Sequence, residues 1–225
     1  MTATSTRRDL WALGGVLFAA TFLAGGIIGG MLAAGPFPMP GVPAAEVARY
    51  FTESRTAVLT VQSAQVLSAL SLLVFVAPVA ALVHRKVGER AALSRLTAGS
   101  GVLSAVLLLA SALLGLAMVP VAAGGNLDLL ETLRQANFLT GGTLHVASLG
   151  LFVGATSVAA RRTKALPRWL SRLGIVQAAL AILSLASLIF FPASLLILLG
   201  RLLGFVWCVA VGVALARGGR RGAEG

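Results

Sequence analysis

Six long apolar stretches constrain this chain more than any other feature of its sequence. A helix rises 1.5 Å per residue, so about 20 apolar residues cross the roughly 30 Å of hydrocarbon in a bilayer. The stretches that reach or approach this length are Leu10–Ala34, Ala57–Val83, Leu96–Ala123, Phe138–Ala160, Leu173–Phe191 and Ala193–Ala216. We therefore predict an all-α fold, a polytopic bundle of six transmembrane helices that forms a single transmembrane domain over residues 1–225.

The composition excludes an ordinary water-soluble domain. Only 11% of the residues are charged and 58% are hydrophobic, whereas soluble domains have about 25% charged residues. The single cysteine, Cys208, excludes an internal disulfide framework and any cysteine-cluster metal site. We expect no cofactor and no metal ion.

The basic residues predict the orientation of the bundle. One side of the membrane would hold Arg7, Arg8, Arg85, Lys86, Arg90, Arg95, Arg161, Arg162, Lys164, Arg168, Arg172, Arg217, Arg220 and Arg221. The other side would hold Arg49, Arg55 and Arg134, offset by Glu46, Glu53, Asp128 and Glu131. Because basic residues concentrate on the cytoplasmic side, we expect both termini in the cytoplasm. The abundance of Arg, Ala and Gly favours a bacterial plasma membrane as the location.

The formal net charge of +11 does not indicate a nucleic-acid partner. The basic residues form short clusters between apolar stretches, and such clusters orient membrane helices and contact anionic headgroups. We expect membrane lipids as partners, together with a membrane protein or a second copy of the chain, and no nucleic acid.

The N-terminus has two interpretations. Arg7 and Arg8 before an apolar stretch are typical of a twin-arginine export signal. The stretch that follows is longer than the apolar region of a signal peptide and ends without a clear cleavage site. We therefore expect an uncleaved first span.

Three segments between the spans have recognisable local patterns. Pro36–Pro43 is rich in proline, which predicts an extended segment, and the helix that follows should continue into the second span. Asn126–Asn137 has a stripe of leucines with Asn126 as an N-cap, which predicts a short helix lying in the outer membrane interface. Pro192 predicts a tight turn between the fifth and sixth spans.

Polar side chains from three spans fall at a similar depth in the outer half of the bundle. They are Gln62 and Gln65 in the second span, His145 in the fourth and Arg201 in the sixth. A charge within hydrocarbon costs at least about 2.5–3.5 kcal/mol, so Arg201 needs a partner or a purpose.

Two hypotheses explain this layer of polar residues. In the functional one, Arg201 binds an anionic group, and His145, Gln65 and Gln62 complete its coordination. In the structural one, the histidine and the glutamines hydrogen-bond between helices, and Arg201 pairs with an acid at the outer surface. The acids considered for this pairing are Glu53, Asp128 and Glu131.

Pairs of glycines four residues apart favour close helix packing. They are Gly25/Gly29, Gly26/Gly30, Gly150/Gly154 and Gly200/Gly204. Leu93–Leu96 and Leu170–Leu173 share the sequence Leu-Ser-Arg-Leu, and each follows a basic segment and begins a span. This similarity is explained either by a duplicated hairpin or by biased composition.

Two further motifs resemble those of a known family. Gly142–His145 reads Gly-Thr-Leu-His, and Leu166–Leu170 reads Leu-Pro-Arg-Trp-Leu, with Gly174 following. The pattern is similar to that of an uncharacterised bacterial multi-spanning family, a domain-of-unknown-function group, although Ser171, Arg172 and Leu173 separate the second motif from its glycine. The resemblance implies a six-helix membrane fold and a role for His145 and Arg168, and it implies no reaction.

No catalytic signature stands out, so we expect that the protein is not an enzyme. The spans contain no Asp or Glu for intramembrane proteolysis or ion-coupled transport, and the chain has no phosphate-binding loop motif. Two function classes remain. The first is a membrane interaction or accessory protein, and the second is a small binder or transporter of an anionic or amphiphilic ligand.

Overall fold

The computed structural model describes residues 11–38, 41–88, 92–190 and 193–221, and all regular structure in these ranges is helical. The elements are α2 (Gly14–Leu32), α3 (Ala44–Glu53), α4 (Arg55–Val87), α5 (Ala92–Ala123), α6 (Leu127–Asn137), η1 (Phe138–Leu144), α7 (His145–Thr163), α8 (Arg168–Leu183), η2 (Ser184–Leu188) and α9 (Ser194–Arg221). Within these ranges, six helical segments are long and apolar enough to cross a membrane, which confirms the predicted fold class. Arg7, Arg8 and Pro192, on which the export-signal and turn predictions depend, lie outside the described residues.

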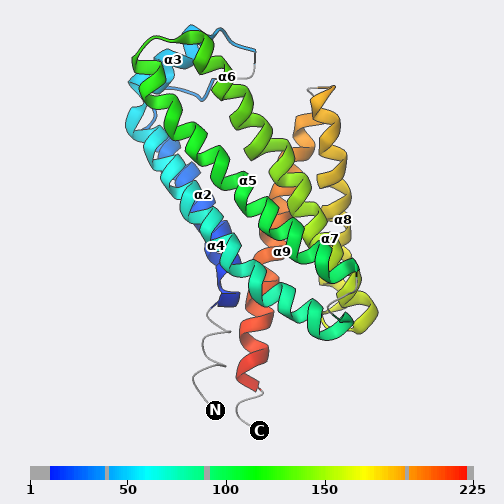
Figure 1. The fold of residues 1–225 in the computed structure, drawn as a ribbon. Helices are drawn as coiled ribbons and strands as arrows, with labels where there is room; N and C mark the ends of the chain where they lie inside the picture. Colours follow the sequence, from blue (N-terminus) through cyan, green and yellow to red (C-terminus); the bar gives the residue numbers. More distant parts are fainter. Residues whose placement is uncertain (1–10, 39–40, 89–91, 191–192, 222–225) are drawn as a thin grey trace.

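The helices form a bundle around α7 (Figure 1). Helix α7 contacts α4, α5, α8 and α9, and α2 contacts α4 and α9. The apolar window of the α6–α7 segment is 78% buried, against 28–44% for the other five segments. The fourth span is therefore the centre of the bundle, with α4, α5, α8 and α9 packed against it and α2 packed on α4 and α9.

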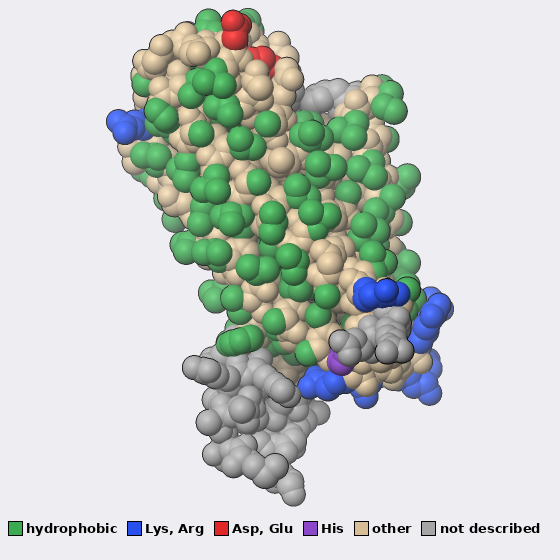
Figure 2. All heavy atoms as spheres, in the orientation of Figure 1, with side chains coloured by type: hydrophobic (Ala, Val, Ile, Leu, Met, Phe, Trp, Pro, Cys, Tyr) green, Lys and Arg blue, Asp and Glu red, His purple; other side chains and the backbone are tan. Residues whose placement is uncertain are grey.

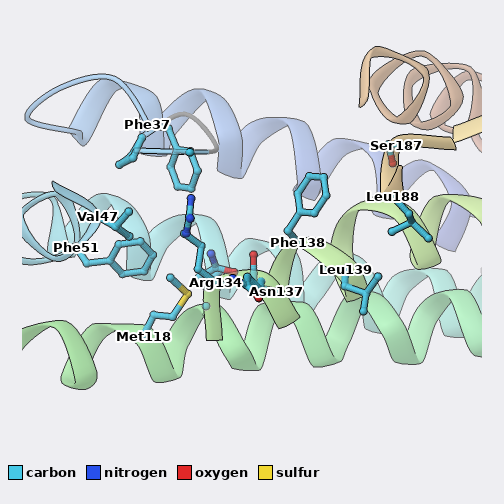
Figure 3. Close-up of a pocket in the computed structure, with 15 residues that line it drawn as sticks. Phe37, Val47, Phe51, Met118, Arg134, Asn137, Phe138, Leu139, Ser187 and Leu188 are labelled. Atoms are coloured by element: carbon cyan, nitrogen blue, oxygen red, sulfur yellow. The ribbon is translucent and has the colours of Figure 1, made fainter. Parts of the chain in front are cut away.

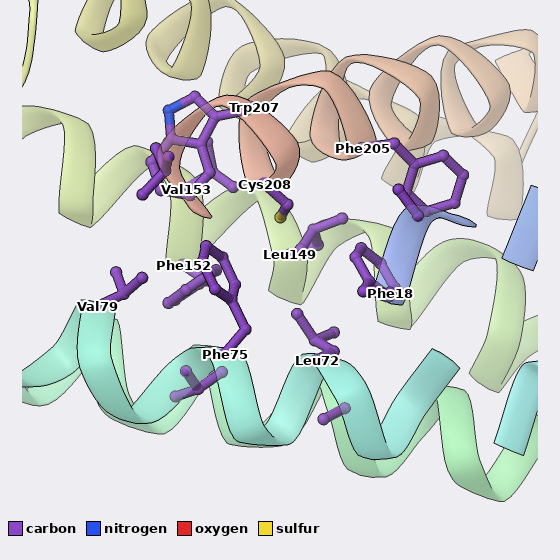
Figure 4. Close-up of a cluster of buried hydrophobic side chains, with 14 of the residues drawn as sticks. Phe18, Leu72, Phe75, Val79, Leu149, Phe152, Val153, Phe205, Trp207 and Cys208 are labelled. Carbon is purple, nitrogen blue, oxygen red and sulfur yellow. The ribbon is translucent and has the colours of Figure 1, made fainter. Parts of the chain in front are cut away.

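The inner core consists of aromatic and aliphatic side chains from α2, α4, α7 and α9 (Figure 4). Phe152 of α7 lies between Phe75 and Trp207, with ring centroids 6.2 Å and 6.0 Å away and both rings edge-on. All three side chains are fully buried. Edge-to-face pairs of this kind add about 0.5–1.5 kcal/mol each beyond the burial of their area.

The outer faces of the helices carry apolar side chains, as expected for surfaces that contact lipid. Ile27, Leu67 and Leu103 are each at least half exposed, and apolar side chains spread over the whole side of the bundle (Figure 2). A soluble protein rarely exposes so large an apolar patch. Most of the Lys and Arg side chains in view gather at one end, and the Asp and Glu side chains lie at the other, as the positive-inside argument predicts (Figure 2).

Two local predictions need correction. The helix after the proline-rich segment does not run unbroken into the second span, because Ser54 interrupts it between α3 and α4. The Ser54 hydroxyl instead accepts a hydrogen bond from the backbone N–H of Ala34 (3.0 Å), which ties α3 to the end of the first span. The N-cap at Asn126 is confirmed, since Asn126 Oδ1 accepts from the N–H of Leu129 (3.1 Å).

The second correction concerns the segment that begins at Asn126. Helix α6 is not a separate interfacial helix, because it continues through η1 into α7 as one helical segment, Leu127–Thr163. Its leucine stripe packs against the bundle, where Leu130 is fully buried with Val47 and Phe51 of α3. One part of the leucine stripe thus packs on α3 and α5, while Leu127 remains exposed.

Candidate functional site

The fourth span begins with a π-helix, η1, that is held against α5. Asn137 Nδ2 donates to the backbone carbonyl of Ser111 (2.6 Å) and to its hydroxyl (3.1 Å). Gly141 makes this close approach feasible, because a Cβ at that position would overlap the Ser111 hydroxyl. A π-helical turn carries an extra residue and is often found at functional sites, and polar groups from several helices lie around η1.

Arg201 of α9 reaches the backbone of η1. Its Nη2 donates a hydrogen bond to the Gly141 carbonyl, and its guanidinium carbon lies 5.0 Å from the centre of the Phe22 ring. The expected pairing with an outer-surface acid is not observed, since Glu131 instead pairs with Arg134, in the one salt bridge among the described residues. A backbone carbonyl and an aromatic face therefore stabilise the Arg201 charge.

His145, the first residue of α7, is fully buried and bonded to α5. Its Nδ1 lies 2.9 Å from the Ser104 carbonyl oxygen and 3.0 Å from the Ser104 hydroxyl. A carbonyl oxygen only accepts, so Nδ1 carries the proton and Nε2 is left as an acceptor. Nε2 is buried without a hydrogen-bond partner, and the ring of Phe18 lies edge-on to His145 at 6.4 Å.

The four predicted site residues do not surround one common cavity. Gln65 donates to the Ser111 hydroxyl (3.4 Å), beside Gly141, and so lies close to the backbone group that Arg201 binds. His145 is bonded to Ser104, seven residues from Ser111 along α5 and therefore about two turns deeper. Gln62 faces a different space, nearer the outer end of the bundle.

That space is an outer cavity of about 440 Å³ between α3, α5, the start of the fourth span and η2 (Figure 3). Its lining consists mainly of apolar side chains with a few polar groups: Phe37, Pro38, Gly41, Val47, Phe51, Gln62, Gly115, Met118, Arg134, Gln135, Asn137, Phe138, Leu139, Ser187 and Leu188. Small-molecule sites have volumes of roughly 300–1,000 Å³ and this kind of lining. We call this space the outer cavity.

Aromatic side chains from the segment before α3 and from α3 form one end of the outer cavity. Phe37 lies edge-on to Tyr50, with ring centroids 5.4 Å apart, and burial raises the pKa of the Tyr50 phenol above its ordinary value. Phe51 is almost completely buried beside Val47. The proline-rich pattern of Pro36–Pro43 predicts only an extended segment, and nothing in that pattern indicates that Phe37 lines a cavity.

The polar groups of the outer cavity differ in whether they already have partners. Arg134 donates two hydrogen bonds of 2.8 Å to Glu131, so its charge is paired. Asn137 is bonded to Ser111, and Ser187 lies 3.3 Å from the Thr143 hydroxyl. Gln62 Oε1 is buried and has no hydrogen-bond partner. A bound molecule that donates a hydrogen bond would satisfy it.

The described residues contain no group of three or more His, Cys, Asp or Glu side chains that could hold a metal ion. Cys208 is a buried free thiol that packs in the inner core beside Val211 and Trp207.

Six apolar helical segments, one of which contains the buried α7, define the class of this chain, a multi-pass helical membrane protein. A family model described as a domain of unknown function (DUF4386) matches residues 13–218, and the chain belongs to this family. The match confirms the expected membership of a domain-of-unknown-function family and assigns no activity. No curated protein and no solved structure matches the chain.

Proposed function

We propose that the protein is a membrane-embedded binder of an uncharged amphiphilic molecule, which it takes into the outer cavity. This is the second of the two function classes that the sequence left open, with the ligand placed at Gln62 and not at Arg201. The observation that carries the proposal is the buried and unpartnered Gln62 Oε1 in an apolar cavity of about 440 Å³. Such an acceptor costs about 1–3 kcal/mol of stability while it is unpaired, and a donor on a ligand recovers this.

The lining favours a molecule with a donor at one end and an apolar body. Phe51 and Met118 offer apolar contact, while Gln62 accepts the hydrogen bond. The one cation in the lining, Arg134, is paired with Glu131, so an anionic group gains little from it. A hydroxyl group on a short hydrocarbon chain fits these requirements better than a carboxylate or a phosphate does.

Exposed apolar side chains at the cavity rim provide a route from the membrane. Phe37 is 67% exposed and Leu188 is 54% exposed, and both also line the outer cavity. Phe138 and Leu139 lie on the same rim and are partly exposed (Figure 3). An amphiphile dissolved in the outer leaflet would therefore reach the cavity without crossing a polar surface.

The test uses a monoacylglycerol with a photoreactive diazirine in its acyl chain. The full chain is placed in phosphatidylcholine nanodiscs, labelled at increasing probe concentration, and the labelled residues are identified by peptide mass spectrometry. We expect saturable labelling at Phe51 and Met118, with competition by unmodified monoacylglycerol. Labelling of the lipid-facing helix surfaces should instead rise in proportion to the probe concentration, without saturating.

Three variants make this test specific. Gln62→Leu removes the acceptor and should raise the half-saturating concentration about two- to tenfold, because one buried hydrogen bond contributes roughly 0.5–1.5 kcal/mol and 1.4 kcal/mol is tenfold. Val47→Phe fills the cavity and should abolish saturable labelling. Gln65→Leu is the matched control, because Gln65 lies one turn away on α4, does not line the cavity, and should label like the wild type.

The proposal would be contradicted by labelling that never saturates. It would also be contradicted if neither Gln62→Leu nor Val47→Phe changed the half-saturating concentration or the extent of labelling. In that case the first function class, a membrane interaction or accessory protein, becomes the better explanation. The interaction would then be sought on the lipid-facing helix surfaces.

A further inference from the structure

A second cavity lies at the opposite end of the bundle, where α7 turns into α8. Its volume is about 560 Å³, and we call it the basic cavity. Its lining contains four cationic residues and a serine: Ala160, Arg161, Lys164, Leu166, Pro167, Arg168, Ser171 and Arg172. It shares no lining residue with the outer cavity.

The charge of the basic cavity is not neutralised by acids. No Asp or Glu lines it, and within the described ranges none of its four cations takes part in a salt bridge. Lys164 is held in a left-handed conformation (φ 54°) that ends α7, where a glycine is more usual. The turn thus has a lysine where backbone geometry alone would favour glycine. Four positive charges around one space attract an anion strongly.

Ser171 supplies an independent sign of a ligand site. Its side chain is only 1% exposed and lines the cavity, and its hydroxyl has no hydrogen-bond partner. A buried hydroxyl without a partner is rare in native structures and needs an explanation. An oxygen of a bound anion, accepting from Ser171 Oγ, would provide one.

The N-terminus of α8 also faces this region. Helix α8 begins at Arg168 after Pro167, and no side chain caps its first turn. The uncapped N–H groups and the helix dipole favour a negative charge at this position. Cationic side chains, an unpaired hydroxyl donor and a free helix N-terminus therefore converge on one cavity.

We propose that the basic cavity binds a phosphate group, with Ser171 and the α8 N-terminus as hydrogen-bond donors and Arg161, Lys164, Arg168 and Arg172 as counter-charges. Phosphate matches this donor set because its several acceptor oxygens pair well with Arg side chains. The phosphate comes from an anionic phospholipid headgroup or from the free ion. Trp169 is 58% exposed on the same turn, and tryptophan is enriched at headgroup depth.

The experiment uses the full chain in phosphatidylcholine nanodiscs at constant ionic strength. In one arm inorganic phosphate is added, and in the other phosphatidylglycerol replaces part of the phosphatidylcholine. The midpoint of thermal unfolding is followed as each is increased, because a molecule that binds only the folded state raises it. A saturable rise with phosphatidylglycerol alone assigns the site to lipid, and a rise with inorganic phosphate assigns it to the free ion as well.

Arg161 and Arg162 form a matched pair for this test. Both are exposed residues in the last turn of α7, but only Arg161 lines the cavity. Arg161→Gln should weaken the saturable effect several-fold, and Arg162→Gln should leave it unchanged. An equal loss in both variants would show diffuse surface attraction and would overturn the proposal.

Ser171→Ala tests the hydroxyl without a risk to folding. Because it removes an unpaired buried group, the ligand-free protein should be at least as stable as the wild type. In the arm that shows a saturable rise, the apparent affinity should fall at least about tenfold, as expected for the loss of a hydrogen bond to a charged acceptor. Wild-type affinity in Ser171→Ala, or no saturable rise in either arm with the wild-type protein, overturns the proposal.

Discussion

Arg201 is a cation within an apolar helix, and contacts with two neighbouring helices offset the cost of placing it there. A charge deep in the membrane costs at least about 2.5–3.5 kcal/mol. A hydrogen bond from a charged donor contributes about 1.5–3 kcal/mol, and a desolvated cation over an aromatic ring about 2 kcal/mol. Arg201 donates a hydrogen bond to the Gly141 carbonyl, and its guanidinium group lies over the Phe22 ring. The free energy gained from these two contacts is therefore similar in size to the cost of placing the charge in the membrane.

We therefore expect Arg201→Leu to change the free energy of unfolding by less than about 1 kcal/mol, because it removes the cost of the charge along with its contacts. Reversible unfolding in mixed micelles measures this. Phe22→Leu is the contrasting variant, since it keeps the charge and removes the ring, and it should destabilise the protein by about 1–2 kcal/mol. A loss above about 3 kcal/mol in Arg201→Leu would show that the charge itself stabilises the fold.

At the scale of helices, the glycine pairs separate into packed and open faces. Gly25 and Gly29 face α4, where a Cβ at either position would overlap Ala64 or Val61. Gly26 and Gly30, one residue further along α2, have no atom within 4 Å of such a Cβ. The first pair sets the distance between α2 and α4, and the second pair does not contribute to this contact.

Gly25→Ala and Gly26→Ala test this difference on adjacent residues of one helix. Gly25→Ala should destabilise the protein by about 1–3 kcal/mol, because the Cβ of Ala64 has no flexible end that could move away. Gly26→Ala should be neutral or stabilising by up to about 1 kcal/mol, from helix propensity alone. Unfolding in mixed micelles gives both values, and equal effects would contradict the packing seen between α2 and α4.

At the scale of the whole molecule, apolar length predicts the spans well and says little about rotation around each helix. The third span was expected at Leu96–Ala123 and forms α5 at Ala92–Ala123. Depth along the helices placed Gln62 and Gln65 in one polar layer, yet the two face different surroundings. Depth is proportional to residue number, whereas the direction of a side chain depends on how each helix is turned in the bundle.

The π-helix is one reason why the directions of side chains in the fourth span could not be predicted from the sequence. An extra residue in η1 rotates every later side chain of the fourth span by about 100° relative to a regular helix. The only sequence signal for it is the glycine pair Gly141 and Gly142, which also occurs in ordinary helices of this chain, as in Gly14 and Gly15. The outer cavity depends on η1 and on Phe37 from a distant segment, so hydropathy could not predict it.

The orientation of the bundle is a property of the whole molecule and follows from its separated charges. The end with the α7–α8 turn carries most of the described Lys and Arg side chains, while Asp128 and Glu131 lie at the opposite end, on α6 (Figure 2). Moving many Lys and Arg side chains across a membrane is unfavourable, so we expect the basic end to lie in the cytoplasm. The outer cavity would then face the outside and the basic cavity the cytoplasm.

Single cysteines at the two ends test this orientation in intact cells. The native Cys208 is buried, so it should add little background to labelling with a membrane-impermeant maleimide. Asp128→Cys should react from outside, and Arg162→Cys should react only after the membrane is permeabilised. Both positions are exposed, so both must react in permeabilised cells, which is the control. The reverse pattern would place the basic cavity outside the cell, where the positive-inside rule does not put so many Arg and Lys residues.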